Sequence, residues 1–275
     1  MTVNPFFQRL NLITGTEAAA ALEKSRALVF GLGGVGSWCA EALVRSGIGK
    51  ISLVDSDRVS ASNINRQAEA TSRTVGRLKT DALKERLEEI NPSCIVTAFP
   101  KAFSKETSAL FDIPGADYVI DAIDTLTYKL DLIEITVAAE TCFFSSMGMA
   151  QKLDPLLIRT ADIWETRSCP LARLVRQGLR KRNFSGHFTV VYSPERLPVR
   201  EGPLRKGPIQ EDPGPSGESG AAAGEGDGGA DGWDSRKKVI NGSAVTVTAA
   251  AGLVLASLVI RDIYARYAPV CADGG

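Results

Sequence analysis

A run of glycines at residues 31–36 constrains the fold of this chain more than any other feature. It follows a short apolar stretch at residues 26–30 and precedes a stretch at residues 35–46 whose apolar side chains have helical spacing. Short apolar runs that end in turn residues are typical of buried parallel strands, and the spacing indicates an amphipathic helix. A buried strand that passes through glycines into a helix is typical of an α/β fold.

Strands and helices alternate through the first 150 residues of the sequence. The expected strands lie at residues 26–30, 50–54, 94–99, 117–123 and 141–145, and the expected helices at residues 35–46, 76–91 and 125–140. This alternation predicts a Rossmann-like, mostly parallel sheet with helices on both faces. The second half is less regular, with a basic helix expected at residues 171–182 and a strand at residues 188–192.

Two segments of the second half differ in composition from the rest. Residues 201–234 are rich in Gly, Pro, Ala and acidic residues and hold almost no large apolar side chains, which predicts a disordered loop. Residues 244–260 are apolar, but the run is slightly short for a membrane span of about 20 residues and is diluted by polar side chains. A buried core helix is the better interpretation, and we expect no membrane span.

Charge and cysteine usage restrict the function. Lys plus Arg and Asp plus Glu both number 32, so a nucleic-acid partner has to be bound by a local basic patch. The N-terminal residues lack the basic start and apolar run of a signal peptide, which indicates a cytoplasmic protein. Five cysteines without a C-x-x-C pair and a single histidine offer no tetrahedral zinc site. We expect no zinc and interpret the cysteines as buried structural thiols.

The glycine run also predicts a phosphate-binding turn. Glycines let the backbone approach a phosphate, and the N-terminus of the next helix supplies free N–H donors and positive potential. The candidate contacts are Gly31, Gly33, Gly34 and Gly36. Asp55 ends the second expected strand about 20 residues further on and suits hydrogen bonds to ribose hydroxyls. These residues indicate an adenine nucleotide, and a nicotinamide or flavin dinucleotide is the commonest ligand of this pattern.

Charged residues after Asp55 favour a triphosphate over a dinucleotide. Arg66 and Lys79 are two cations downstream of the glycine turn, and they can neutralise the charge of ATP as pyrophosphate leaves. Asp124 follows an expected parallel strand, where open α/β sheets bind their ligands, and its carboxylate can hold Mg²⁺ on phosphate oxygens. The expected cofactors are therefore ATP and Mg²⁺.

Each of these side chains has an ordinary explanation when it is taken alone. Lys79 on an exposed helix is usually a solvated charge, and Arg66 fits a surface ion pair. Asp124 can cap the helix that begins after it, a position that aspartate favours. The functional interpretation depends on the joint order and spacing of the three residues.

The order of these residues resembles the ubiquitin-activating-enzyme superfamily, whose bacterial members adenylate the C-terminus of small sulfur-carrier proteins. The matching pieces are residues 31–36, Asp55-Ser-Asp57, Asn63-x-x-Arg66-Gln67, Lys79 and Asp121-x-x-Asp124. The resemblance implies that Asp55 binds ribose, and that Arg66 and Lys79 bind the phosphates. It implies that Asp124 lies beside the metal, a role for which Asp121 is less suited. The other implied nucleotide contacts are Asp57, Asn63, Gln67 and Ile123.

The same resemblance implies the domain organisation and the assembly. One ThiF-like adenylating domain is expected over residues 1–275, with an N-terminal arm or helix at 1–25, a nucleotide-binding half at 26–150 and a C-terminal half at 151–275. Members of the superfamily are homodimers in which an N-terminal arginine reaches the nucleotide of the partner subunit. Arg9 stands in the matching place.

Within the superfamily the sequence is similar to the tRNA threonylcarbamoyladenosine dehydratases. The cues are Gly34-Val-Gly-Ser-Trp38, Arg45-Ser-Gly-Ile-Gly49, Asn63-Ile-Asn-Arg-Gln67, Asp121-Ala-Ile-Asp124, Ser146-Met-Gly148, Lys152-Leu-Asp-Pro155, Asp162-Ile163, Cys169-Pro-Leu-Ala-Arg173, Val190-Val-Tyr-Ser193 and Asn241-Gly-Ser243. The likeness covers nearly the whole chain apart from the Gly/Pro-rich loop. Relatives that activate sulfur carriers usually carry two C-x-x-C zinc pairs, which this sequence lacks.

The resemblance implies a reaction in two steps. The threonyl carboxylate of the modified adenosine in tRNA attacks the α-phosphate of ATP, which gives an acyl-AMP and pyrophosphate. A nitrogen of the carbamoyl group then attacks the activated carbonyl, closes a hydantoin ring and expels AMP, with proximity supplying much of this step. No protein nucleophile is required.

Two other functions stay open at this point. One is an adenylyltransferase that activates the C-terminus of a ubiquitin-like sulfur carrier. The other is a non-catalytic adaptor that binds a partner such as a cysteine-desulfurase sulfur-acceptor protein. Intact Arg66, Lys79 and Asp124 speak against the adaptor, which has no use for them.

Cys169 is a candidate nucleophile, and the basic helix is a candidate contact for tRNA. Cys169 can take an acyl group in a sulfur-transfer mechanism, but a packed thiol ahead of Pro170 is the better interpretation. The basic helix offers phosphate contacts for tRNA, although a solvated face is the ordinary outcome of such a run. Its cations are Arg173, Arg176, Arg180, Lys181 and Arg182, and Arg236-Lys-Lys238 forms a second cluster.

Overall fold

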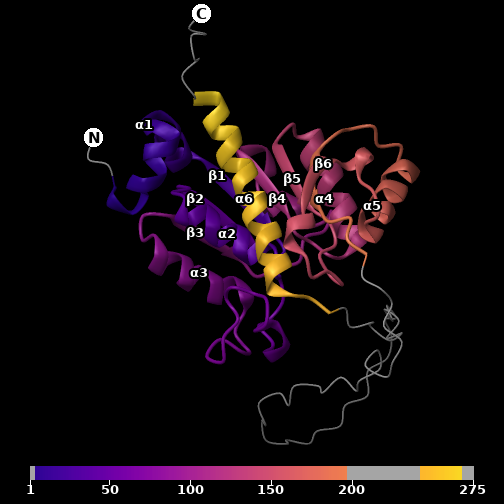
Figure 1. Cartoon of the computed structure of the whole chain (residues 1–275), viewed down its shortest axis with the longest axis horizontal. Coiled ribbons are helices and arrows are strands. Elements are labelled where there is room, and N and C mark those ends of the chain that lie inside the picture. Colours follow the sequence, from indigo (N-terminus) through magenta and orange to yellow (C-terminus); the bar gives the residue numbers. More distant parts are fainter. Residues whose placement is uncertain (1–3, 197–241, 268–275) are drawn as a thin grey trace, which may run out of the picture.

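A seven-stranded sheet forms the centre of the molecule (Figure 1). The computed structural model of the chain describes residues 4–196 and 242–267, so the loop expected at 201–234 and the cluster at 236–238 lie outside the described residues. The strands are β1 (Arg26–Phe30), β2 (Lys50–Val54), β3 (Ile95–Phe99), β4 (Tyr118–Asp121), β5 (Cys142–Ser146), β6 (Arg159–Asp162) and β7 (Thr189–Tyr192). Their order is β3-β2-β1-β4-β5-β7-β6, and only β6 runs antiparallel to its neighbour. The expectation of a mostly parallel α/β sheet is confirmed.

Helices cover both faces of this sheet. One group consists of α1 (Gln8–Lys24), α2 (Gly36–Arg45), α3 (Lys79–Ile90) and α6 (Val245–Tyr267), and the other of α4 (Leu126–Ala138) and α5 (Pro170–Lys181). Side chains along β1 alternate between the two apolar cores, with Ala27 and Val29 in the first and Leu28 and Phe30 in the second. Burial on both faces explains the continuous apolar runs from which the strands were predicted.

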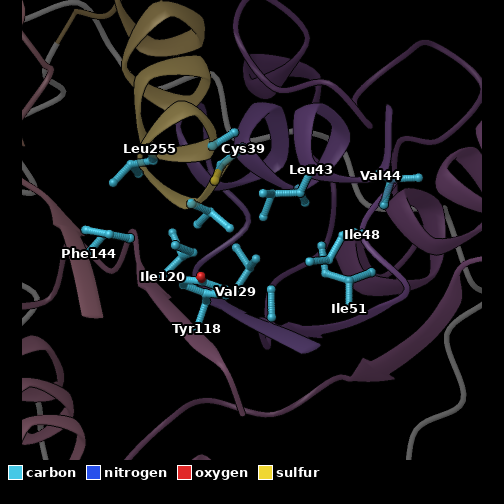
Figure 2. Packing of buried hydrophobic residues seen from close by; sticks show 14 of the residues in the cluster. Val29, Cys39, Leu43, Val44, Ile48, Ile51, Tyr118, Ile120, Phe144 and Leu255 are labelled. Carbon is cyan, nitrogen blue, oxygen red and sulfur yellow. The ribbon is translucent and has the colours of Figure 1, made fainter. Parts of the chain in front are cut away.

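Helix α6 completes the first core although it comes from the far end of the sequence. Figure 2 shows Leu255 of α6 near Cys39 of α2, with Val29 of β1 in the same cluster. Gly252 permits this close approach, because a Cβ there would lie 2.4 Å from the carbonyl oxygen of Val35. Among the described helices, α6 alone has the length and hydropathy of a membrane span. It packs against α1, α2 and the sheet, which confirms the expected core helix.

The observed elements differ from the expected ones mainly at their ends. Helix α3 begins at Lys79, three residues later than expected, because Gly76 has a φ of +85° and belongs to a turn. Strand β4 ends at Asp121, because the N–H of Ile123 donates to the side chain of Asp121 and not to a neighbouring strand. Strand β6 was not expected, since it is four residues long and lies at the edge of the sheet.

Candidate nucleotide-binding site

The glycine loop connects the end of β1 to the start of α2. Gly31 has a φ of +85°, and a Cβ there would lie 2.8 Å from the carbonyl oxygen of Ala122. A Cβ on Gly36 would lie 1.8 Å from the carbonyl oxygen of Gly31. The packing of the loop itself therefore requires these two glycines. A Cβ on Gly33 would meet only the side-chain nitrogen of Gln67, at 4.0 Å, so the loop is open on that side.

Asp55 follows β2 and fixes the glycine loop. Its Oδ2 accepts a hydrogen bond from the backbone N–H of Leu32 at 2.7 Å, and its Oδ1 accepts one from the N–H of Asp57 at 2.8 Å. The side chain of Asp55 is 10% exposed. Because each carboxylate oxygen can accept more than one hydrogen bond, this arrangement still leaves acceptor capacity for ribose hydroxyls.

Lys79 begins α3 and directs its ammonium group at the two aspartates that follow β2. Its Nζ lies 2.7 Å from Oδ2 of Asp57 and 3.8 Å from Oδ2 of Asp55. The side chain of Lys79 is 7% exposed, so it is not the solvated surface charge of the ordinary explanation. Oδ2 of Asp55 therefore lies near both this buried cation and the backbone N–H of Leu32 in the glycine loop.

Arg66 approaches the glycine loop from another side. Its Cγ lies 3.2 Å from the point that a Cβ on Gly34 would occupy, and Nε1 of Trp38 donates to its carbonyl oxygen at 2.9 Å. The guanidinium donates to the carbonyl oxygen of Ser62 at 2.9 Å and to Oδ1 of Asn65 at 3.1 Å. Within the described residues Arg66 pairs with no carboxylate, which argues against the ordinary surface ion pair.

Asn63 and Gln67 shape the segment that carries Arg66. Oδ1 of Asn63 accepts from the N–H of Ser60 at 3.0 Å, and its carbonyl oxygen accepts from the N–H groups of Arg66 and Gln67, both at 3.0 Å. Gln67 is 6% exposed, and its Oε1 has no hydrogen-bond partner among the described residues. Asn63 therefore fixes the turn, whereas Gln67 directs its side-chain nitrogen toward Gly33 and leaves Oε1 without a partner among the described residues.

Glu69 buries a carboxyl group in the same segment, and sequence reasoning missed it. The residue is 2% exposed, and neither of its carboxylate oxygens has a hydrogen-bond partner within normal geometry among the described residues. The hydroxyl of Ser37 donates instead to the carbonyl oxygen of Gly33, at 2.8 Å. Burial raises the pKa of Glu69 from 4.5 to about 7. Its own backbone N–H, the charge of Lys79 and the Ser37 hydroxyl oppose the rise, and the charge of Asp55 adds to it.

The two aspartates after β4 have opposite surroundings. Asp121 is fully buried, and its Oδ1 accepts from the N–H of Ile123 at 3.0 Å. Its Oδ2 accepts from Nζ of Lys129 at 2.6 Å and from Oγ of Ser145 at 2.7 Å. Asp124 is exposed, and among the described residues its carboxylate receives only a 3.5 Å contact, from the hydroxyl of Thr125. A ligand therefore has access to Asp124 and not to Asp121.

The first turn of α6 and the residues just before it contact the glycine loop and the segment that carries Arg66. The Cβ and Oγ1 of Thr248 lie 3.1 Å from the point that a Cβ on Gly34 would occupy. Nδ2 of Asn65 donates to the carbonyl oxygen of Ser243 at 3.0 Å. Sequence reasoning did not place Thr248 in the site, because this contact joins segments that are far apart along the chain.

Asp124 is also the donor to consider for a metal ion. The described residues contain no group of three or more His, Cys, Asp or Glu side chains placed to hold one. Mg²⁺ in nucleotide sites is usually held by one or two carboxylates together with phosphate oxygens and water. One accessible carboxylate beside the glycine loop fits an ion that arrives with the nucleotide.

A family model described as the ThiF family matches residues 7–263 of the sequence. The chain belongs to the ThiF family. It is 43% identical to the tRNA threonylcarbamoyladenosine dehydratase of Bacillus subtilis over 200 residues, which cover 73% of this chain and 79% of that protein. The family expected from the sequence motifs is therefore confirmed.

Solved structures resemble this ThiF-family chain over almost its full length. Crystal structures of the E. coli tRNA N6-threonylcarbamoyladenosine dehydratase in complex with AMP and with ATP give TM-scores of 0.77 and 0.76. Both are 28% identical to this chain, and each match covers 97% of this chain and 98% of the other. The fold that holds the glycine loop is therefore shared with proteins solved with adenine nucleotides.

The ThiF-family chain keeps Arg9 away from its own glycine loop. Arg9 is exposed in the first turn of α1, two residues after Phe7. The ring of Phe7 packs at 3.4 Å from the point that a Cβ on Gly47 would occupy, just beyond the C-terminal end of α2. The glycine loop lies at the other end of α2, a helix of ten residues, about 15 Å away. Arg9 therefore does not converge with Lys79 and Arg66 within one chain.

The five cations of the basic helix α5 divide into two groups. Arg176 hydrogen-bonds to Oγ1 of Thr166, and Arg182 lies 2.7 Å from the carboxylates of both Asp131 and Glu134. These two arginines are tied to their own chain. The three that stay exposed are Arg173, Arg180 and Lys181.

The described cysteines are free thiols in packed surroundings. Cys169 is 3% exposed and lies directly before α5. Burial raises the pKa of Cys94 and of Cys142 to about 11, and it raises the pKa of Cys39 further. The fifth cysteine, Cys271, lies outside the described residues.

Proposed function

We propose that this ThiF-family chain is an ATP-dependent tRNA-modifying enzyme. It adenylates the threonyl carboxylate of N6-threonylcarbamoyladenosine in tRNA and cyclises the product to the hydantoin form. The observation that carries the proposal is the set of charges around the glycine loop. A buried Lys79, an Arg66 that has no acidic partner among the described residues and an accessible Asp124 suit a triphosphate that releases pyrophosphate. The name of the Bacillus subtilis relative and the nucleotides in the two crystal structures support the same choice.

For the first step the protein has to bind the triphosphate of ATP and to stabilise the negative charge of the leaving pyrophosphate. Backbone N–H groups at the start of α2 bind phosphate oxygens on the open side of Gly33, and Asp55 accepts from the ribose hydroxyls. Lys79 and Arg66 stabilise the negative charge that moves onto pyrophosphate. Asp124 would hold a magnesium ion, which would further neutralise the charge of the phosphate oxygens. The remaining residues proposed to line the nucleotide are Gly31, Gly34, Gly36, Asp57, Asn63, Gln67 and Ile123.

The second step uses the energy of the mixed anhydride. A carbamoyl nitrogen of the same nucleoside attacks the activated carbonyl, the C–N bond forms, and AMP leaves with the electron pair of the broken C–O bond. Because nucleophile and electrophile belong to one molecule, closure of the ring depends on proximity. This route needs no acyl-enzyme, which agrees with the packed position of Cys169.

The proposed assembly is a homodimer in which Arg9 of one subunit serves the nucleotide of the other. Two large apolar side chains of α1, Leu12 and Ile13, are 82% and 76% exposed, and Leu253 of the adjacent α6 is 52% exposed. An apolar surface of this kind suits a second copy of the chain. Mixing inactive Arg9→Ala and Lys79→Ala variants should restore about a quarter of the parent activity, because half of the dimers then hold one intact site. No recovery after subunit exchange contradicts a shared site.

The tRNA contact is assigned to the exposed cations of α5, which are Arg173, Arg180 and Lys181, with Arg176 and Arg182 as neighbours that shape the helix surface. Such side chains bind phosphates without reading sequence. A tRNA substrate also agrees with the cytoplasmic location expected from the sequence.

One reaction tests the proposal. The protein is incubated with ATP, Mg²⁺ and tRNA that bears threonylcarbamoyladenosine, and the nucleosides are weighed by mass spectrometry. Loss of one water from that nucleoside, dependent on ATP, supports the proposal. Turnover only with a ubiquitin-like carrier protein moves the assignment to the carrier adenylyltransferase. The assay is repeated with an added cysteine-desulfurase sulfur-acceptor protein. A changed rate of water loss supports this protein as a partner, and an unchanged rate argues against it.

A further inference from the structure

Three buried side chains near the ends of β4 and β5 have no role in the reaction described so far. Lys129 of α4, Asp121 of β4 and Ser145 of β5 are each 0% exposed. Nζ of Lys129 donates to Oδ2 of Asp121 at 2.6 Å and to Oγ of Ser145 at 3.3 Å, and Oγ of Ser145 donates to Oδ2 of Asp121 at 2.7 Å. We call these three residues the buried cluster.

An ion pair in this position is not explained by stability alone. Removing two charges from water costs several kcal/mol, and apolar side chains of similar volume often stabilise a core as well or better. Other residues of the same three elements are buried and apolar, such as Ile120 of β4, Phe144 of β5 and Ile133 of α4. Packing could therefore be achieved without charges at these positions. The contacts of the three polar side chains show what the charges can do here.

The buried cluster holds the turn that carries Asp124. Oδ2 of Asp121 is fixed by Lys129 and Ser145, while Oδ1 of the same carboxylate accepts from the N–H of Ile123 at 3.0 Å. One oxygen of the Asp121 carboxylate is therefore fixed by the cluster, and the other oxygen fixes the backbone of the turn at Ile123. Within the part of the chain that the structure describes, the carboxylate of Asp124 receives one long contact, so its position depends on the turn.

The same turn supports the glycine loop. The N–H of Ala122 donates to the carbonyl oxygen of Phe30 at 2.8 Å, at the start of the loop. The carbonyl oxygen of Ala122 lies 2.8 Å from the point that a Cβ on Gly31 would occupy, and its Cβ lies 3.2 Å from the corresponding point on Gly36. A displacement of Ala122 therefore displaces the loop that binds phosphate.

We propose that Lys129 is a positioning residue for nucleotide binding and adenylation. Acting through Asp121, it sets residues 122–124 so that Asp124 and the glycine loop face the same nucleotide. Lys129 touches no substrate. An ammonium group suits this role because it donates to Asp121 and Ser145 at once. It thereby joins α4 to the ends of β4 and β5.

A double-mutant cycle between Lys129 and Asp124 separates this role from a purely structural one. The variants are Lys129→Met, Asp124→Asn and the double variant, and the readouts are kcat for AMP formation with tRNA and the Kd for ATP with Mg²⁺. Lys129→Met should lower kcat by about 100-fold, the scale of a misplacement of about 1 Å. The double variant should lose little more than the worse single variant, because a misplaced Asp124 has little left to lose. Losses that multiply overturn the proposal.

Two further variants keep the test decisive. Glu41→Gln removes the charge from another ion pair, in which the buried Glu41 of α2 lies 2.6 Å from the partly exposed Arg86 of α3. It should lower stability and leave kcat unchanged, and a loss of kcat equal to that of Lys129→Met overturns the proposal. If Lys129→Met does not fold, Ser145→Ala removes a single hydrogen bond of the cluster. It should lower kcat about 10-fold, and its combination with Asp124→Asn should lose little more than the worse single variant. An unchanged kcat overturns the proposal.

The rate readout rests on the proposed function, whereas the affinity readout does not. A parent chain that turns over no tRNA sinks the proposed function and leaves the binding cycle intact. In that case non-additive losses of ATP affinity at Lys129 and Asp124 support the positioning role, and additive losses overturn it.

Discussion

Replacing Glu69 by glutamine should stabilise the folded chain, and the gain should grow as the pH rises. The residue is 2% exposed, and burial raises the pKa of its carboxyl group from 4.5 to about 7. Below pH 4.5 the group is protonated in the folded and the unfolded chain. Between pH 4.5 and about 7 only the folded chain retains the proton, so each rise in pH weakens folding.

The magnitude follows from the pKa difference. Each pKa unit corresponds to about 1.4 kcal/mol, so ionising Glu69 in the folded chain weakens folding by about 3 kcal/mol above pH 7. Glutamine has nearly the same shape and no charge to bury, so the variant escapes this penalty. Urea unfolding of both chains at pH 4.5 and pH 8, without nucleotide, measures the difference.

The pH dependence of that difference decides whether the reasoning holds. The advantage of Glu69→Gln should be about 3 kcal/mol larger at pH 8 than at pH 4.5. Glu89→Gln on α3, where the side chain is exposed, controls for the same chemical change in contact with water. An advantage that is equal at both pH values, or a Glu69→Gln variant that is less stable at pH 8, refutes the argument.

Three other changes test separate parts of the account. Cys169→Ala should leave ring closure near the parent rate, and complete loss in a folded variant would show that the thiol takes part in the chemistry. Joint replacement of Arg180 and Lys181 by glutamate should weaken tRNA binding. The slope of log K against the logarithm of the salt concentration should fall by roughly 1 for each phosphate that the helix no longer neutralises. An unchanged slope in filter binding removes α5 from the interface. Gly252→Ala should lower the free energy of unfolding by about 1–3 kcal/mol, because its Cβ would lie 2.4 Å from the carbonyl oxygen of Val35; unchanged urea unfolding contradicts this packing.

Much of the fold could be read from the sequence because its signals are local. Apolar runs doubly buried in a parallel sheet stay continuous, and the glycines at 31 and 36 mark positions where no side chain fits. The helix ends were less accurate, since Gly76 delays the start of α3 by three residues. Strand β6 was missed because a short edge strand lacks an apolar run.

The site was only partly predictable from the sequence. Asp55, Lys79 and Asp124 follow strands or open helices at spacings that a motif captures. Thr248 and Lys129 reach the site region through tertiary contacts between segments that no local pattern links. The internal hydrogen bonds of Arg176 and Arg182 likewise depend on partners that the helix sequence does not reveal.

The adenylation step is tested most directly by following one oxygen atom. The chain is supplied with unlabelled ATP and with tRNA whose threonylcarbamoyladenosine carries ¹⁸O in both carboxylate oxygens. Attack of the carboxylate on the α-phosphate, followed by ring closure, leaves one of these oxygens on the released AMP. Mass spectrometry should therefore find AMP with one ¹⁸O atom, in equal amount to the cyclised nucleoside. Formation of ADP, or of AMP without the label, contradicts carboxylate adenylation at the glycine loop.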